Sequence, residues 1–158
     1  MSAPHYIILG AGVIGLTTAL RLFDQNPTSK ILILASHLPG DRSINYTSPW
    51  AGANWLSVAT DDGRQENWDR VTYHKFGELA DEVRESGVKR LPIWAFYDSP
   101  MREAGVLSQG KERIWYEEMT ELKVLRKGGE EVKTHAEGAE FGYECQSFVV
   151  DVQVYLPW

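Results

Sequence analysis

The chain has 158 residues, of which 43% are hydrophobic and 24% are charged, a composition typical of a folded domain and not of a disordered or fibrous protein. Its net charge of −6 argues against nucleic acid as a partner. Cys145 is the only cysteine, so the chain can form neither an internal disulfide nor a cysteine-rich metal site, which fits a reducing, intracellular compartment. No apolar run reaches the roughly 18 residues of a membrane span, and we expect no membrane partner.

The N-terminal part of the chain predicts a β-α-β unit. Residues 6–9 (YIIL) are short, apolar on both faces and followed by glycine, which is typical of a buried parallel strand. Residues 13–23 place apolar side chains at helical spacing, and the Asn26-Pro27 pair ends that helix. Residues 30–35 (KILILA) predict a second buried strand, so the crossover should be right-handed.

The remaining chain predicts a loop, one long helix and a region of antiparallel strands. Residues 45–55 (NYTSPWAGANW) predict a long aromatic loop, and residues 64–85 predict a helix with Gly87 as its C-cap. Residues 90–98 and 146–157 predict strands, with a polar, glycine-containing stretch between them. We expect the apolar side chains of the helix to face inward, and they are Trp68, Val71, Phe76, Leu79 and Val83.

Three glycines form the most informative motif of the sequence. The spacing Gly10-x-Gly12-x-x-Gly15 follows a predicted strand and opens a predicted helix, which is the context of a dinucleotide-binding turn. Gly10 permits a tight turn, Gly12 lets the backbone approach a pyrophosphate, and Gly15 lets the helix pack on the strand. The helix N-terminus offers free N–H groups to the phosphates. A glycine turn without a ligand is the alternative, and the motif does not distinguish FAD from NAD.

The residues that would hold the adenosine ribose depart from the usual pattern. A carboxylate normally stands at the end of the second strand, whereas this chain has Ser36 and His37 there and no carboxylate before Asp41. Either Ser36 and His37 bind the ribose hydroxyls, or Asp41 folds back, or a backbone group serves. Arg42 is the residue that could read a 2′-phosphate, and we give an NADP preference little weight.

The glycine motif lies in GAGVIGLTTALRL (residues 10–22), which is followed by LASHLPGD (34–41) and YTSPWAGANW (46–55). Together with VKRLPIWAFYDSP (88–100) and YECQSFVVDVQVYLPW (143–158), these segments resemble the fungal D-amino-acid oxidase and D-aspartate oxidase family of FAD enzymes. The resemblance covers almost the whole chain, and SPWAGANW at this distance from the glycines is its most specific part.

The resemblance implies an α/β fold made of two incomplete parts. Residues 1–86 would be the N-terminal part of a Rossmann-like FAD-binding domain, with its β-α-β unit and parallel sheet, the flavin loop and a helix. Residues 87–158 would be the first part of a mixed or antiparallel β substrate-binding region. The chain would then be the N-terminal half of a larger enzyme.

The resemblance also implies a non-covalent FAD. Residues 10–15 would hold the pyrophosphate, Ser36 and His37 would lie near the adenosine ribose, and Ser43 would lie near the phosphates. The complete set of residues that we expect to bind the cofactor is Gly10, Ala11, Gly12, Val13, Ile14, Gly15, Ser36, His37, Ser43, Ala51, Gly52, Asn54 and Trp55.

The last four of these residues match the flavin loop of the family. Ala51 and Gly52 would let main-chain N–H groups approach the flavin ring, and Asn54 would hydrogen-bond the edge of the ring. Trp55 would close the mouth of the pocket. An aromatic loop that only packs on a sheet is the alternative interpretation of SPWAGANW.

The activity that the resemblance implies is oxidative deamination of a D-amino acid to a 2-oxo acid, ammonia and hydrogen peroxide. In this family an arginine, with tyrosines beside it, binds the substrate carboxylate, and these residues belong to segments beyond those matched here. We therefore assign no catalytic residue and expect this segment alone to be inactive. The residues that select a neutral or an acidic substrate are also outside the matched segments, so the sequence predicts no substrate preference. The expected partners are a D-amino acid, oxygen and the missing C-terminal half, with a homodimer left open. The family is usually peroxisomal, although the chain ends in Leu-Pro-Trp and not in a targeting tripeptide, and cytoplasm is the alternative.

Two other functions stay open: an inactive truncated FAD-binding fragment and an NAD-binding dehydrogenase domain. No metal site is expected, because the four histidines lack ligand spacing and the Asp61-Asp62 pair is typical of a solvated turn. Cys145 is expected in the core, and Tyr97 and Arg102 at a strand edge and its turn. We expect the apolar residues near the C-terminus to expose surface that a partner would cover; they are Val149, Val150, Val152, Val154 and Trp158.

Overall fold

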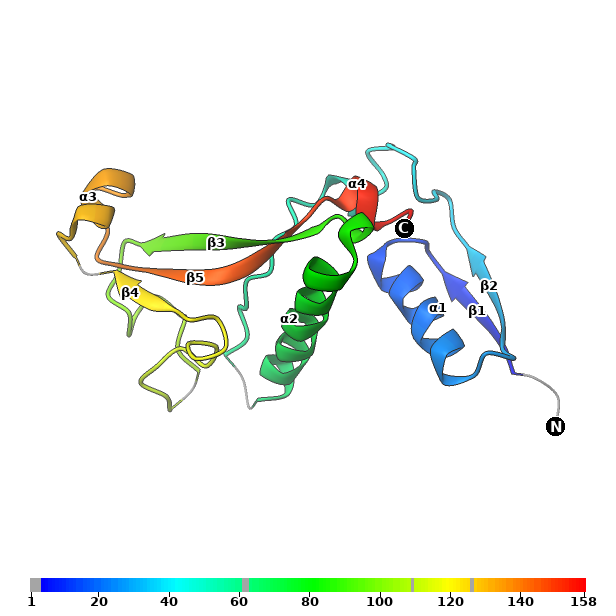
Figure 1. Cartoon of the computed structure of the whole chain (residues 1–158), viewed down its shortest axis with the longest axis horizontal. Helices are drawn as coiled ribbons and strands as arrows, with labels where there is room; N and C mark the ends of the chain where they lie inside the picture. The colour runs from blue at the N-terminus through cyan, green and yellow to red at the C-terminus, as the bar shows by residue number, and fades with distance from the viewer. Residues whose placement is uncertain (1–3, 61–62, 109, 126) are drawn as a thin grey trace. The chain divides into compact units, whose positions relative to one another are not determined.

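The computed structural model describes residues 4–60, 63–108, 110–125 and 127–158, so the Asp61-Asp62 pair lies outside the described residues. The chain divides into two compact units that interleave along the sequence (Figure 1). The first unit consists of Met1–Ala53, Glu85–Gly87 and Val150–Trp158, and the second consists of Asn54–Arg84 and Val88–Val149. Within the described ranges, no helix is both long enough and apolar enough to cross a membrane.

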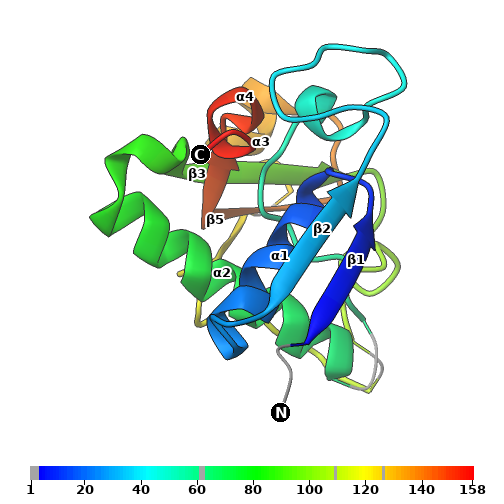
Figure 2. The ribbon, with the colours of Figure 1, turned by 90° about the vertical axis from the view of Figure 1, so that its right-hand side faces the viewer.

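The first unit begins with the predicted β-α-β arrangement. Strand β1 (His5–Leu9) and strand β2 (Lys30–Leu34) pair in parallel, and helix α1 (Val13–Gln25) connects them. Figure 2 shows α1 running alongside both strands. Asn26 caps the helix by donating its backbone N–H to the Leu22 carbonyl at 3.1 Å. The two predicted strands, the helix and its end are therefore confirmed.

The two faces of this sheet differ in burial. Ile8 pairs with Ile33, and a side-chain carbon placed on Gly15 of α1 would lie 3.4 Å from Ile8 Cγ2, so this face meets the helix. On the opposite face every large apolar side chain is exposed, Leu9 to 80%; the four are Ile7, Leu9, Leu32 and Leu34. The prediction that both strands are buried is wrong for this chain, because parallel strands need a covering layer on each face and the described residues supply only one.

The first unit also contains η1 (Ser48–Trp50), α4 (Val152–Tyr155) and all but the first residue of η2 (Arg84–Ser86). Helix α4 replaces the predicted strand after residue 150, since the Asp151 side chain accepts from the Gln153 N–H at 3.1 Å and starts a helical turn. Gly87 follows η2 with φ +73°, and its carbonyl accepts from the Asp151 N–H at 2.9 Å.

The second unit contains α2 (Arg64–Glu82), β3 (Val88–Tyr97), β4 (Lys123–Leu125), α3 (Glu130–His135) and all but the last residue of β5 (Phe141–Val150). The strands form an antiparallel sheet in the order β3-β5-β4. The predicted antiparallel region is therefore confirmed. The sequence did not predict β4 and α3, because three and six residues are too short for a periodic pattern to be recognised.

Helix α2 differs from its prediction in length and in orientation. It ends at Glu82 with Val83 as its C-cap, so Gly87 is not its cap. Tyr73 and Leu79 are buried, whereas Trp68 and Val71 are 58% and 60% exposed. The inward placement predicted for Trp68 and Val71 is wrong, because the buried stripe passes through Tyr73 and leaves both residues outside it.

Aromatic side chains form the core of the second unit. The Trp55 ring lies 4.8 Å from the ring of Tyr73 and 5.6 Å from that of Tyr116, and Tyr73 packs 4.9 Å from Phe148. The hydroxyl groups of Tyr116 and Tyr143 are 2.8 Å apart. These edge-to-face contacts are typical of a packed aromatic core.

Cys145 lies in the core, as predicted, and is 1% exposed. Burial raises the pKa of its thiol to about 11. The thiol is therefore protonated and unreactive at neutral pH.

Candidate functional site

The glycine turn joins β1 to α1 and has the backbone that the motif predicts. Gly10 has φ +98°, which a residue with a side chain rarely adopts, and its N–H donates to the Leu34 carbonyl at 2.8 Å. A side-chain carbon on Gly15 would overlap the Gly10 carbonyl oxygen, so only glycine allows this close packing of the helix on the turn. Gly12 is the N-cap of α1 and has no side-chain cap of its own.

A residue that the sequence did not single out lies against this turn. The Val13 N–H, the first of α1, donates to Ser48 Oγ at 3.1 Å. A side-chain carbon on Gly12 would lie 2.9 Å from the same oxygen, so Gly12 is also what admits Ser48. No periodic signal links these positions, because they are 35 residues apart.

Tyr46 makes a second connection to the turn, and the sequence did not single it out either. Its hydroxyl donates to the Ala11 carbonyl at 2.6 Å, and both residues are buried. Burial, and then the nearby charge of Asp41, raises the pKa of the Tyr46 hydroxyl. The His37 ring stacks on the Tyr46 ring with centroids 6.0 Å apart. The aromatic loop is therefore tied to the turn on both sides of Gly12.

The segment after β2 brings a carboxylate back toward the end of the strand. Asp41 Oδ2 accepts from the Leu38 N–H at 3.0 Å and lies 3.7 Å from His37 Nδ1, while Ser36 is exposed. Asp41 therefore lies beside His37, and which of the three arrangements would hold the ribose stays a prediction. The Arg42 guanidinium donates to the Gln153 side chain.

Ser43 and the first two residues of the predicted flavin loop also belong to the first unit. The Ser43 carbonyl accepts from the Trp50 indole N–H at 3.0 Å, which holds the loop in a compact turn. The Ala51 N–H donates to the Ser48 carbonyl at 3.3 Å. Ala51 and Gly52 are exposed, and a side-chain carbon on Gly52 would meet no atom within 4 Å.

The other two predicted flavin-loop residues belong to the second unit. Asn54 is exposed and forms an isolated bridge with Val149. Trp55 is 5% exposed, and its indole N–H donates to the Asp69 carbonyl at 3.0 Å. Its predicted place at the mouth of a cofactor pocket stays a prediction.

The chemistry of the turn favours an anion. Helix α1 has no acidic residue in its first turn, so no side-chain carboxylate there opposes the partial positive charge of the helix N-terminus. The N-terminus of a helix that follows a glycine turn is the kind of site at which phosphates bind. Among the described residues, no group of three or more His, Cys, Asp or Glu could hold a metal ion.

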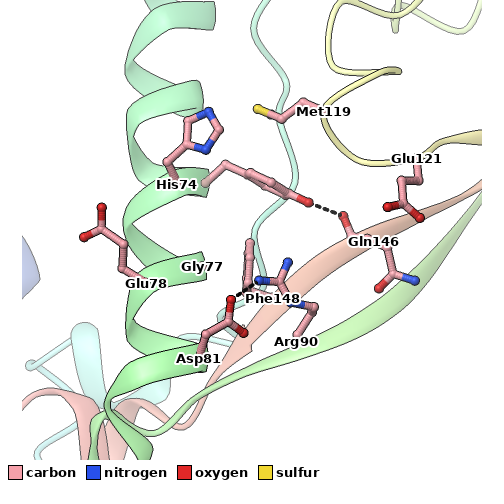
Figure 3. A pocket seen from close by; sticks show the side chains of 10 residues that line it. His74, Gly77, Glu78, Asp81, Arg90, Met119, Glu121, Gln146 and Phe148 are labelled. Carbon is pink, nitrogen blue, oxygen red and sulfur yellow. Dashed lines mark hydrogen bonds and ion pairs between the residues drawn. The ribbon is translucent and has the colours of Figure 1, made fainter.

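A cavity of about 710 Å³ lies in the second unit, and none of the predicted site residues lines it (Figure 3). Arg90 is its main cation, and its guanidinium is already bound by Asp81 at 2.7 Å and stacked 4.8 Å from the Phe148 ring. The lining residues are Tyr73, His74, Gly77, Glu78, Asp81, Arg90, Met119, Glu121, Gln146 and Phe148. This cavity combines no nucleophile with a base, and we assign no chemistry to it.

Known proteins resemble this chain along almost all of its length. It is 33% identical over 150 residues to a D-amino-acid oxidase of Schizosaccharomyces pombe, with 95% of this chain and 40% of that protein covered. It is 33% identical over 163 residues to a D-amino-acid oxidase of Fusarium vanettenii, with 96% and 42% covered. A D-aspartate oxidase of Talaromyces thermophilus is 29% identical over 175 residues, with 98% and 45% covered. No family model matches the chain.

All three relatives are, by name, oxidases of D-amino acids. Over almost its whole length the chain is therefore similar to D-amino-acid oxidases and D-aspartate oxidases. It spans 40% to 45% of the length of these relatives.

Proposed function

We propose that this chain supplies the cofactor-binding part of an FAD-dependent D-amino-acid oxidase. The glycine turn is the observation that carries the proposal. A side-chain carbon on Gly12 would crowd Ser48 Oγ at 2.9 Å, one on Gly15 would overlap the Gly10 carbonyl oxygen, and Gly10 has a backbone conformation suited to glycine. The names of the relatives support the reaction class.

The residues present fit such a cofactor. Residues 10–15 would bind the pyrophosphate through backbone N–H groups, Ser43 would lie near the phosphates, and Ser36 and His37, with Asp41 beside His37, would hold the adenosine ribose. Ala51, Gly52 and Asn54 would lie along the flavin ring. The chemistry that FAD supplies when bound is the acceptance of a hydride from the α-carbon of the substrate.

The reaction we propose for the whole enzyme converts a D-amino acid and oxygen to a 2-oxo acid, ammonia and hydrogen peroxide. This chain would bind and orient the cofactor, and we assign no catalytic residue to it. The clamp for the substrate carboxylate would belong to the part of the relatives that this chain does not span. Residues 1–86 would form part of a Rossmann-like FAD domain and residues 87–158 part of the substrate-binding domain, in a peroxisomal enzyme.

An inactive FAD-binding fragment is the second candidate, and the exposed sheet face of the first unit favours it. A two-stranded sheet with one covered face is at best marginally stable alone. We therefore propose that the 158-residue chain alone has no oxidase activity. Hydrogen peroxide formed from D-alanine or D-aspartate in the presence of FAD would contradict this.

Replacement of a glycine in the turn tests cofactor binding. Gly12→Ala places a carbon 2.9 Å from Ser48 Oγ and crowds the pyrophosphate, so we expect FAD affinity to fall by at least about tenfold. Gly77→Ala is the matched control, because its added carbon would make ordinary contacts at 3.5 and 3.6 Å. FAD is titrated into each protein, and its binding is followed by flavin fluorescence. NAD is titrated in parallel, and its binding is followed by the fluorescence of the protein's tryptophans. Equal FAD affinity in both variants, or a wild-type chain that binds NAD and not FAD, would refute the proposal.

A further inference from the structure

We propose that Ser48 is itself a phosphate-binding residue. Its hydroxyl oxygen accepts the first N–H of α1, and its proton is donated to a phosphate oxygen of the dinucleotide. Ser48 is not one of the residues that the family resemblance assigns to the cofactor. The inference rests on the proposed function, since it requires that a phosphate-bearing ligand binds at the glycine turn.

Hydrogen-bond accounting at the helix N-terminus leads to this proposal. The first four N–H groups of a helix have no partner within the helix, and that of Val13 is one of them. Ser48 Oγ accepts from it at 3.1 Å. A serine hydroxyl can accept two hydrogen bonds and donates one. Within the described ranges, the Ser48 proton has no acceptor, so the Ser48 hydroxyl offers an anion one donor in place of the Val13 N–H that it occupies.

The position of Ser48 is held from both sides. Tyr46, two residues earlier, donates to the Ala11 carbonyl at 2.6 Å, and Pro49, the next residue, is buried. The N-cap position itself is glycine and carries no side chain, so the hydroxyl that caps α1 comes from a different segment of the chain. A donor held in this way loses little conformational entropy when it binds a ligand.

The same contact connects two parts of the proposed site. The Ser48 carbonyl accepts from the Ala51 N–H at 3.3 Å, so the residue that would touch the phosphate is hydrogen-bonded to the segment expected along the flavin ring. The proposed contact of the Ser48 hydroxyl is nevertheless with the phosphate and not with the flavin ring. We expect for this reason that a phosphate-bearing ligand without a flavin ring uses Ser48 as well.

The test compares ADP with adenosine, which lacks phosphates, on the full 158-residue chain. We expect Ser48→Ala to weaken ADP binding by about tenfold or more and to leave adenosine binding unchanged, because the lost hydrogen bond is to a charged group. Ser48→Thr keeps the hydroxyl and should restore ADP affinity. Thr47→Ala is the matched control, since Thr47 is the exposed neighbouring hydroxyl residue. Ligand-observed NMR measures affinities of both ligands into the millimolar range.

A ligand-free measurement checks the structural premise separately. Hydrogen exchange of the Val13 amide should be faster in Ser48→Ala than in the wild type, and unchanged exchange would overturn the proposal. Equal weakening of ADP and adenosine would also overturn it, since Ser48 would then only cap the helix. If the wild-type chain binds neither ADP nor FAD, the proposed function itself fails, and this inference fails with it.

Discussion

At the scale of single residues, hydroxyl groups tie distant parts of the chain together. Tyr46 and Ser48 bind the glycine turn at 2.6 and 3.1 Å, across 35 residues in each case. In the second unit, the Tyr143 hydroxyl lies 2.8 Å from that of Tyr116 and 3.4 Å from that of Tyr97. Buried hydroxyl groups need such partners, because an unpaired one would cost about 1–3 kcal/mol.

Tyr116 should make the chain sensitive to alkaline pH. Burial raises its pKa to about 12 from the usual value of 10.0, against the smaller lowering effect of its hydrogen bond to Tyr143. The unfolded chain then loses this proton at a lower pH than the folded chain, so its contribution to stability is complete below pH 10 and is lost as pH rises toward 12.

Urea unfolding at several pH values measures this effect. We expect the free energy of unfolding to fall as pH rises above 10, and to fall less in Tyr116→Phe, which cannot ionise. If the free energy of unfolding falls equally with pH in both proteins, the effect belongs to other groups. Tyr143 is one such group, since its pKa is raised by burial and by its hydrogen bonds to Tyr116 and Tyr97.

At the scale of elements, α2 packs on the sheet through a narrow aromatic stripe. Phe148 of β5 is 0% exposed, with its ring 4.9 Å from that of Tyr73 and 6.2 Å from that of Phe76. Trp68, on the same helix as Tyr73, is 58% exposed, and the Arg64 guanidinium lies 5.3 Å from its ring centroid. Trp68, which was predicted to face inward, therefore contributes little to the packing of α2 on the sheet.

Truncation of these two aromatic residues should have unequal effects. Phe148→Ala leaves a cavity between α2 and β5, and we expect the free energy of unfolding to fall by about 3–5 kcal/mol. Trp68→Ala is the control and should cost about 1 kcal/mol or less, because it removes mainly an exposed cation–π contact. Urea unfolding followed by circular dichroism compares them. A larger loss for Trp68→Ala would contradict the orientation of α2.

Helix orientation is also where interpretation of the sequence failed most clearly. The β-α-β unit and the long helix were predictable, because hydrophobic periodicity and the Asn26-Pro27 signal act within a few residues. The rotation of α2 was not, since Trp68 and Val71 fit a helical stripe as well as Tyr73 does. Only the aromatic side chains of Trp55 and Phe148, which come from other segments, determine which stripe is buried.

At the scale of the whole molecule, exposed apolar surface is the main feature. The uncovered face of the β1–β2 sheet carries four large apolar side chains, those of Ile7, Leu9, Leu32 and Leu34. Val154 and Trp158 near the C-terminus are also exposed, as expected, whereas Val149, Val150 and Val152 are half-buried. Contiguous apolar surface of this kind favours association.

The chain by itself should therefore self-associate as its concentration rises, despite its net charge of −6. Leu9→Lys places a charge at the C-terminal end of β1 on the uncovered face and should reduce association without loss of folding, because Leu9 is 80% exposed. Val124→Lys, at a 49% exposed position of β4, is the control and should behave as the wild type. Sedimentation velocity over a range of concentrations measures this, and equal association of all three proteins would contradict the prediction.

The sequence by itself determined the β-α-β unit, the place of the glycine turn and the similarity to D-amino-acid oxidases, because these depend on backbone sterics and on patterns within short segments. Gly10, Gly12 and Gly15 could be assigned separate roles from their spacing alone; the surroundings of Gly10 and Gly15 agree with those roles, and the role of Gly12 stays a prediction. Only the tertiary structure decided which residues meet the turn. Ser48 and Tyr46 reach it across 35 residues, and a contact over that separation depends on the path of the loop, which no local pattern encodes.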